Sequence, residues 1–197
     1  MIPKAERDEA TALIDFWFGS PRSPERFKNR PEWFRVDPAF DESLRAQFSD
    51  MQRRAADGAL AAWAGEAEPC LAQILLLDQL PRNLFRGSAL AFATDPMAQD
   101  AARDAVARGF DRSLPGPWRQ FIYLPFMHSE KLEDQERAIA LYTGLARDPA
   151  FAGSLDYARR HHDIVARFGR FPHRNAALGR TSTAEEKFFL TQPGSAF

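Results

Sequence analysis

Apolar residues in this chain recur at intervals of three and four, and no stretch keeps up an alternation of apolar and polar residues. Phe40, Leu44, Phe48 and Met51 show the pattern, with Asp, Arg and Gln between them. A period near 3.6 places such residues on one face of an α-helix, whereas a half-buried strand requires a period of two. The sequence therefore predicts an all-α protein without strands.

Proline and glycine divide the chain into helices. Three aspartates each precede a proline. We expect each proline to be the first residue of a helix, where its missing N–H costs nothing, and each aspartate carboxylate to cap that helix. These pairs are Asp37-Pro38, Asp95-Pro96 and Asp148-Pro149. Residues 182–185, Ser-Thr-Ala-Glu, predict a capping box for a further helix. Glycines after apolar runs, such as Gly58, Gly109 and Gly169, predict helix ends.

Eight or nine helices fit between these signals, packed as successive antiparallel pairs. The segment 69–79 is almost entirely apolar, which predicts a central helix. No shift in composition marks a boundary, so we expect one domain, residues 1–197. Periodicity alone leaves two architectures open, a solenoid of helical hairpins and an irregular bundle.

Bulk composition narrows the function classes. The net charge is −1, so the molecule has no overall field to gather nucleic acid or an acidic membrane. The purest apolar run, residues 74–77, is too short to cross a bilayer, and the N-terminus lacks the apolar stretch of a signal peptide. The single cysteine, Cys70, rules out an internal disulfide. We therefore expect a soluble cytoplasmic protein in which Cys70 is a small buried hydrophobe.

The segment 161–175, HHDIVARFGRFPHRN, gathers groups that are costly to bury. On a helical wheel, His161 lies in the middle of an apolar stripe with Tyr157, Ile164, Val165 and Phe168, and His162 lies at its edge. Adjacent helical histidines diverge, and the HExxH spacing of zinc enzymes is missing. His161 therefore predicts either a hydrogen-bonded core histidine or a functional group.

Positive charge is concentrated near the same place. Six arginines and one aspartate lie between Arg159 and Arg180. Arginine offers a rigid fork of donors that suits carboxylate and phosphate, although such arginines can also bind the protein's own acids. Two other segments carry buried-type polar groups: residues 75–87, which include Asp78 and Gln79 behind four apolar residues, and residues 124–135, which include His128, Ser129 and Glu130. Ser129 could equally cap the following helix.

Three stretches, LDQLPRNLFRG, FIYLPFMHSE and HHDIVARFGRFPHRN, closely resemble a bacterial family catalogued as domain of unknown function 924, DUF924. DFWFG at 15–19, AFATDP at 91–96 and LGRTSTAEEKFFL at 178–190 also resemble family segments, so the resemblance covers nearly the whole chain in order. The family is grouped with tetratricopeptide-like α–α superhelices, which favours stacked antiparallel helical hairpins. Leu80, Ser88 and His162 depart from the residues that the family often has there.

The resemblance implies a site but supplies no reaction. Its motifs implicate thirteen residues: Asp78, Gln79, Arg82, Asn83, His128, Ser129, Glu130, His161, Arg167, Arg170, His173, Arg174 and Asn175. Arg86, beyond the proline bend at Pro81, is the fourteenth candidate.

The leading hypothesis is a binding module, in which the three segments converge and Arg82, Arg86, Arg170 and Arg174 hold an anionic small molecule or an acidic peptide group. A hydrolase-type enzyme that uses His128, Ser129, Glu130 and His161 is the second reading. Ser129 lacks the nucleophile-elbow context Gly-x-Ser-x-Gly, and no cofactor motif appears. A metal at His128, Glu130 and His161 would rest on residue type alone, so no metal or cofactor is expected.

A third reading makes the polar segments a structural network that fixes helix packing, with a protein partner bound elsewhere. Neither nucleic acid nor a membrane is expected as a partner.

Overall fold

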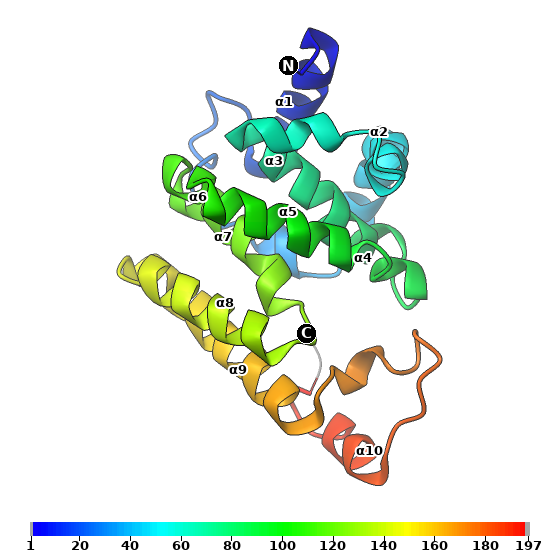
Figure 1. Ribbon diagram of the computed structural model, residues 1–197. Helices are drawn as coiled ribbons and strands as arrows, with labels where there is room; N and C mark the ends of the chain where they lie inside the picture. The colour runs from blue at the N-terminus through cyan, green and yellow to red at the C-terminus, as the bar shows by residue number, and fades with distance from the viewer. Residues whose placement is uncertain (1, 196–197) are drawn as a thin grey trace. The chain divides into compact units, whose positions relative to one another are not determined.

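Helices account for all regular structure in the part of the chain that the computed structural model describes, residues 2–195, with Pro31 described by its backbone only (Figure 1). The α-helices are α1 (Lys4–Phe18), α2 (Pro38–Ala56), α3 (Ala67–Ile74), α4 (Leu80–Leu84), α5 (Asp95–Ala107), α6 (Phe110–Ser113), α7 (Gly116–Met127), α8 (Leu132–Leu145), α9 (Ala152–Phe168) and α10 (Ala184–Leu190). A π-helical turn, η3 (Leu75–Gln79), joins α3 to α4 without a break. With these three counted as one, residues 2–195 contain nine α-helices, which confirms the predicted class and number.

Short 3-10 helices make several of the connections. They are η1 (Pro31–Phe34), η2 (Ala61–Gly65), η4 (Ala89–Ala91), η5 (Pro149–Phe151) and η6 (Pro172–Arg174). No helix among residues 2–195 combines the length and the apolar character needed to cross a membrane.

The described chain forms two compact units. Unit 1 contains residues 2–86 and 90–125, and unit 2 contains residues 87–89 and 126–195. The expectation of a single domain over residues 1–197 stays a prediction.

In unit 1, helices pack against the next helix but one: α1 contacts α3, α2 contacts α4, and α3 contacts α5. This is the packing of stacked helical hairpins in an α–α superhelix. α3 is buried on all sides, from Pro69 to Ile74, which confirms the prediction of a central helix. Cys70 in this helix is buried, and burial raises the pKa of its thiol to about 11, as expected of an inert core residue.

The π-helical turn η3 has a local cause in Pro81. In an α-helix the N–H of residue 81 would bond to the carbonyl of Leu77, but proline has no N–H. The hydroxyl of Thr94 donates to the Leu77 carbonyl instead, at 2.6 Å. The N–H of Leu80 reaches back five residues to the carbonyl of Leu75, which is the π-helical pattern. Asp78 and Gln79 therefore lie in a turn of a kind that is frequent at functional sites.

Unit 2 is built on the hairpin of α8 and α9, which lie side by side in Figure 1. The six residues between them are too few for anything but an antiparallel turn. Ile164 and Val165 of α9 pack with Phe171 in a small core, against which Phe168 and Phe189 also lie. Gly169 has φ +68°, a left-handed conformation that ends α9, as predicted.

The predicted caps hold in part. Asp37 accepts from the N–H groups of Ala39 and Phe40 at the start of α2. Asp148 caps a turn as well, but that turn is the 3-10 helix η5. Asp95 was wrongly predicted to be a cap, because the helix starts at Asp95 itself and its carboxylate binds Arg82.

The capping box of α10 is displaced by one residue from the predicted position. Thr183 accepts from the N–H of Glu186 at 3.1 Å, and the carboxylate of Glu186 accepts from the N–H of Thr183 at 2.7 Å. Ser182, predicted as the cap, instead accepts from the amide of Asn175.

Candidate functional site

The candidate residues fall into the two units. Unit 1 holds Asp78, Gln79, Arg82, Asn83 and Arg86, and unit 2 holds the other nine. Within unit 2, two of the predicted segments meet: the carboxylate of Glu130 accepts from the backbone N–H of Phe171 at 2.8 Å. That the segment from Asp78 to Arg86 joins them stays a prediction.

In unit 1, Asp78 is fully buried and has partners on two sides. The side-chain amide of Gln79 donates to its Oδ2 at 2.5 Å. Nη1 of Arg82 lies 3.4 Å from Oδ1 of Asp78 and 2.9 Å from Oδ1 of Asp95. Arg82 thus connects the π-helical turn η3 with the start of α5. It also supplies the opposite charge that the buried carboxylate of Asp78 requires.

Asn83 and Arg86 share one acid, Asp41 of α2. Arg86 binds it with a two-pronged contact, Nε to Oδ2 at 2.8 Å and Nη2 to Oδ1 at 3.0 Å, and Asn83 donates to Oδ1 at 2.7 Å. Burial alone would raise the pKa of Asp41, but Arg86 and Asn83 outweigh it and lower that pKa. The contacts tie α2 to the end of α4.

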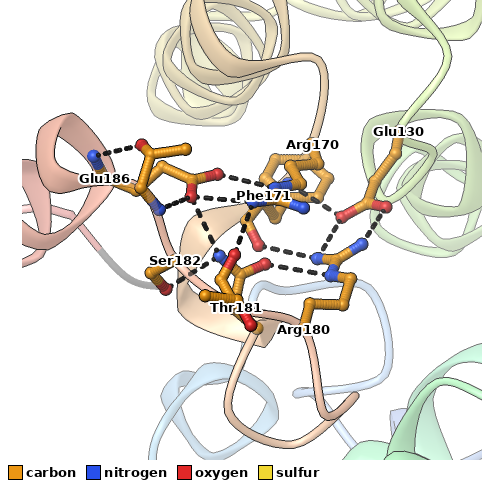
Figure 2. A network of polar contacts seen from close by, with 9 residues as sticks. Glu130, Arg170, Phe171, Arg180, Thr181, Ser182 and Glu186 are labelled. Carbon is orange, nitrogen blue, oxygen red and sulfur yellow. Dashed lines mark hydrogen bonds and ion pairs between the residues drawn. The ribbon is translucent and has the colours of Figure 1, made fainter.

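Figure 2 shows the polar network of unit 2, which has Glu130 at one end. Arg180 donates to both carboxylate oxygens of Glu130, at 2.7 and 2.9 Å, and also to the carbonyl of Phe171 at 3.1 Å. Burial would raise the pKa of Glu130, yet Arg180 and the N–H of Phe171 lower it overall. Glu130 is therefore a carboxylate held in place, not a carboxylic acid ready to donate a proton.

Glu186 forms the other end of the network. Arg170 binds both of its oxygens, at 2.6 and 2.8 Å, and the amide of Asn175 contacts it at 3.3 Å. These contacts, with the hydrogen bond to Arg170 as the largest cause, lower the pKa of Glu186 to about 2. Asn175 also accepts from Nε of Arg180 at 2.9 Å, so it connects the two ends.

A second cluster surrounds the ring of Phe171. The His161 ring contacts it edge-on with centroids 5.6 Å apart, and the His173 ring lies 5.5 Å away. The guanidinium of Arg174 lies over its face at 4.5 Å. His128 lies next to His161, with 6.2 Å between ring centroids. We call His128, His161, Phe171, His173 and Arg174 the histidine cluster.

His161 is buried and stays neutral at physiological pH. Burial is the main cause that lowers its pKa to about 3, and the charges of His128, Arg174 and His173 lower it further. Its Nδ1 pairs with the carbonyl of Tyr157 at 2.8 Å, so this nitrogen carries the proton. The wheel prediction holds for His161, Ile164 and Val165, but Tyr157 is 51% exposed rather than buried.

Ser129 stabilises the turn before α8. Its hydroxyl donates to Asp134 at 2.7 Å and accepts from the N–H of Lys131 at 3.2 Å. Lys131 occupies the N-cap position of α8 and makes no side-chain capping hydrogen bond, so Ser129 is not the N-cap residue. The Ser129 side chain is buried and its proton is directed at a carboxylate, which does not favour its use as a nucleophile.

Arg167 lies at the surface, where it binds Glu185 with both sides exposed. No group of three or more His, Cys, Asp or Glu side chains in residues 2–195 is placed to hold a metal ion. Two surface hollows, of about 250 and 380 Å³, are lined by residues between 19 and 38 of unit 1 and by none of the candidate residues.

Several acids and bases that complete these contacts were not among the predicted site residues. They include Asp41, Arg180 and Glu186. Asp41 and Glu186 lie in the first turns of helices, where acidic residues are common. Nothing in the nearby sequence therefore indicates that they bind distant arginines. Arg180 belonged to the group of six arginines but to none of the three motifs.

Comparison with known proteins returned a family and a structure. Residues 13–194 match the family model described as "Bacterial protein of unknown function (DUF924)". A solved structure of a protein of unknown function, ATU0120 from Agrobacterium tumefaciens, is similar, with a TM-score of 0.83 and 42% sequence identity over 93% of this chain and 97% of that chain. No curated protein matches. Because the family match covers nearly all of the chain, this protein belongs to the DUF924 family.

Proposed function

We propose that this protein is a binding module for an anionic group, and that the histidine cluster of unit 2 recognises the anion. The observation that carries the proposal is the gathering of Arg174, His128 and His173 around two buried rings, Phe171 and His161. A guanidinium and two imidazoles can all donate hydrogen bonds to carboxylate or phosphate oxygens.

The electrostatics of the cluster support an anion rather than a cation. The charged neighbours that act on His161 are His128, Arg174 and His173, and all three disfavour a further positive charge there. Only 6% of Arg174 is exposed, so salt screens its charge much less than it screens a charge at the surface. A bound anion would relieve the mutual repulsion of these groups.

The polar network supports the proposal by holding the segment that presents the cluster. Arg170, Phe171 and Asn175 are each bonded to Glu130, Arg180 or Glu186. The backbone on either side of His173 and Arg174 is therefore fixed, and a site that is ordered before binding loses less entropy when the ligand arrives. The network provides the scaffold, and the cluster provides the contacts.

The same contacts narrow the predicted set of binding arginines. Arg86 and Arg170 are each already bound to a carboxylate by two hydrogen bonds, and Arg82 bridges two carboxylates. To take a ligand, they would have to give up these partners. We assign anion recognition to Arg174 and its histidine neighbours because these basic side chains gather around the rings of Phe171 and His161.

A thermal-shift experiment tests the assignment. Wild type, Arg174→Gln and His128→Gln are melted in phosphate, sulfate or succinate, with sodium chloride at matched ionic strength as reference. For wild type we expect one of the three anions to raise Tm by at least about 2 °C, the shift that corresponds to roughly 1 kcal/mol for a protein of this size. The shift should vanish in Arg174→Gln and shrink in His128→Gln.

Arg167→Gln is the matched control, because it removes a guanidinium from the same unit at an exposed pair with Glu185. This variant should keep the wild-type shift. Sulfate and phosphate also stabilise proteins by exclusion from their surfaces, an effect that all variants share. If Arg174→Gln shows the same anion-dependent shift as wild type and Arg167→Gln, the cluster does not bind the anion.

A further inference from the structure

Two phenylalanines and a valine are exposed in the connection between α1 and α2, in unit 1. Phe27, Phe34 and Val36 are 59%, 60% and 73% exposed. Large apolar side chains that lie singly at a surface need no explanation, but three exposed within ten residues of one connection point to an interaction site. We call these three residues the patch. None of these three residues belongs to the histidine cluster, whose residues are all in unit 2.

Both exposed rings lie against α7. Phe27 stacks on Trp118 with centroids 6.2 Å apart, and Phe34 stacks on Phe121 at 6.1 Å with the rings nearly parallel. Trp118 and Phe121 are three residues apart in a helix, so they occupy the same face on adjacent turns. Phe27 and Phe34 therefore each cover a buried ring of α7, one helical turn apart.

Hydrogen bonds from the same connection hold this surface in place. Trp33 donates from its ring nitrogen to the carbonyl of Trp17 at 2.9 Å, and Arg30 donates to the same carbonyl at 2.8 Å. Trp118 donates to the carbonyl of Arg26 at 3.1 Å. Since its backbone is anchored on both α1 and α7, the surface is preorganised for a partner.

The charges around the patch are unequal. The local acids are engaged: Glu25 with Lys28, Glu32 with Arg30, and Asp37 with the start of α2. Arg22 and Arg35 are exposed and take part in no hydrogen bond or ion pair within residues 2–195. Arg35 also borders the hollow of about 380 Å³, next to Val36. The charge available to a partner is therefore positive.

The size of the patch limits the kind of partner. If a whole phenylalanine exposes about 200 Å², the two rings together present on the order of 240 Å². A stable protein–protein interface buries about 800 Å² on each partner, so the patch is small for a lasting contact with a second copy of this chain. A short peptide segment with one apolar anchor matches this area.

We propose that Phe27, Phe34 and Val36, with Arg35 at their edge, form a docking surface for a short acidic peptide segment of a partner protein. One or two apolar side chains of the segment lie on the aromatic rings and in the hollow. Neighbouring aspartates or glutamates of the segment pair with Arg35 and Arg22.

Fluorescence anisotropy with three sets of labelled nine-residue peptides tests the surface. The first set carries a central Leu, Phe or Trp between aspartates and glutamates. The second has lysines in place of the acids, and the third has serine in place of the anchor. We expect a member of the first set to bind at least tenfold more tightly than its counterparts. The double variant Phe27→Ala/Phe34→Ala should weaken it at least tenfold, and Arg35→Glu should reverse the charge preference.

Phe188→Ala is the matched control, since Phe188 is a phenylalanine with 66% exposure on α10 of unit 2. It should leave binding unchanged, and circular dichroism should show that all variants are folded. The proposal fails if no acidic anchored peptide binds more tightly than its counterparts, or if the double variant binds as wild type does. It also fails if sedimentation reveals a dimer that the double variant dissolves, because the occupant would then be a second copy.

Discussion

The polar network and the histidine cluster of unit 2 share the segment 170–175 but differ in how their charges are balanced. In the network, Arg180 faces Glu130 and Arg170 faces Glu186, each through two hydrogen bonds. In the cluster, His161 has Arg174, His128 and His173 as its charged neighbours. The network pairs opposite charges through hydrogen bonds, whereas the cluster gathers three basic side chains around His161. Arg174 also interacts with the charge of Glu130.

This difference separates a structural role from a binding role. Paired charges in a partly buried place stabilise one arrangement of the backbone and leave little for a ligand to gain. Groups of one sign repel one another, so they cost stability unless something of the opposite charge is present. Density of polar residues along the sequence therefore does not distinguish the two roles, whereas the sign of each neighbour does.

The largest predicted effect breaks the network. Glu186→Ala removes the acceptor of Arg170, Asn175 and the N–H of Thr183, and it should lower the free energy of unfolding by about 3 kcal/mol. The neighbouring Glu185→Ala removes only an exposed partner of Arg167 and should cost less than about 1 kcal/mol. Urea unfolding at pH 7.5 measures both. If both variants lose the same free energy of unfolding, the network stabilises the protein no more than an exposed ion pair does.

A smaller effect tests the neutrality of His161. Its pKa is lowered to about 3 in the folded protein, so the unfolded state binds the proton more readily. Stability is then complete above about pH 6.5 and is lost as the pH falls from there towards 3. Between pH 7.5 and 5.5 this residue should account for a loss of about 1 kcal/mol in the free energy of unfolding.

His161→Gln should remove that part of the pH dependence, while His162→Gln should keep it because the ring of His161 is untouched. Glu186 does not interfere, since its pKa of about 2 lies below this range. Urea titrations at the two pH values give the comparison. An identical pH dependence in His161→Gln and wild type would contradict a buried neutral imidazole.

The smallest predicted effect relieves the repulsion within the cluster. His128→Gln removes the neighbour that contributes most, after burial, to the lowered pKa of His161. That pKa should rise, so the folded state tolerates acid better and the midpoint of acid unfolding should move down by a few tenths of a pH unit. Circular dichroism against pH measures the midpoint, with His162→Gln as reference. A midpoint that moves up instead would mean that His128 supports His161 rather than opposing it.

Much of the fold could be predicted because helix signals are local. The spacing of Phe40, Leu44 and Phe48, the aspartate at position 37 and the glycine at position 169 depend only on nearby residues. Pro81 is the local cause of the π-helical turn, but the residue that takes over the freed Leu77 carbonyl, Thr94, lies 17 residues away, so the turn was not predicted. Asp95 was mistaken for a cap for the same reason, since Arg82 competes for its carboxylate from another helix.

The sequence by itself determined the helical class, the central position of α3, the burial of His161 and the segments in which polar groups are gathered. Tertiary structure decided which of those groups form hydrogen-bonded ion pairs and which gather around the rings of Phe171 and His161. An arginine has the same sequence signature whether it faces Glu186, as Arg170 does, or the ring of Phe171 beside His161, as Arg174 does. Coulomb energies depend on distance and burial, and both are set by contacts between residues far apart in the chain.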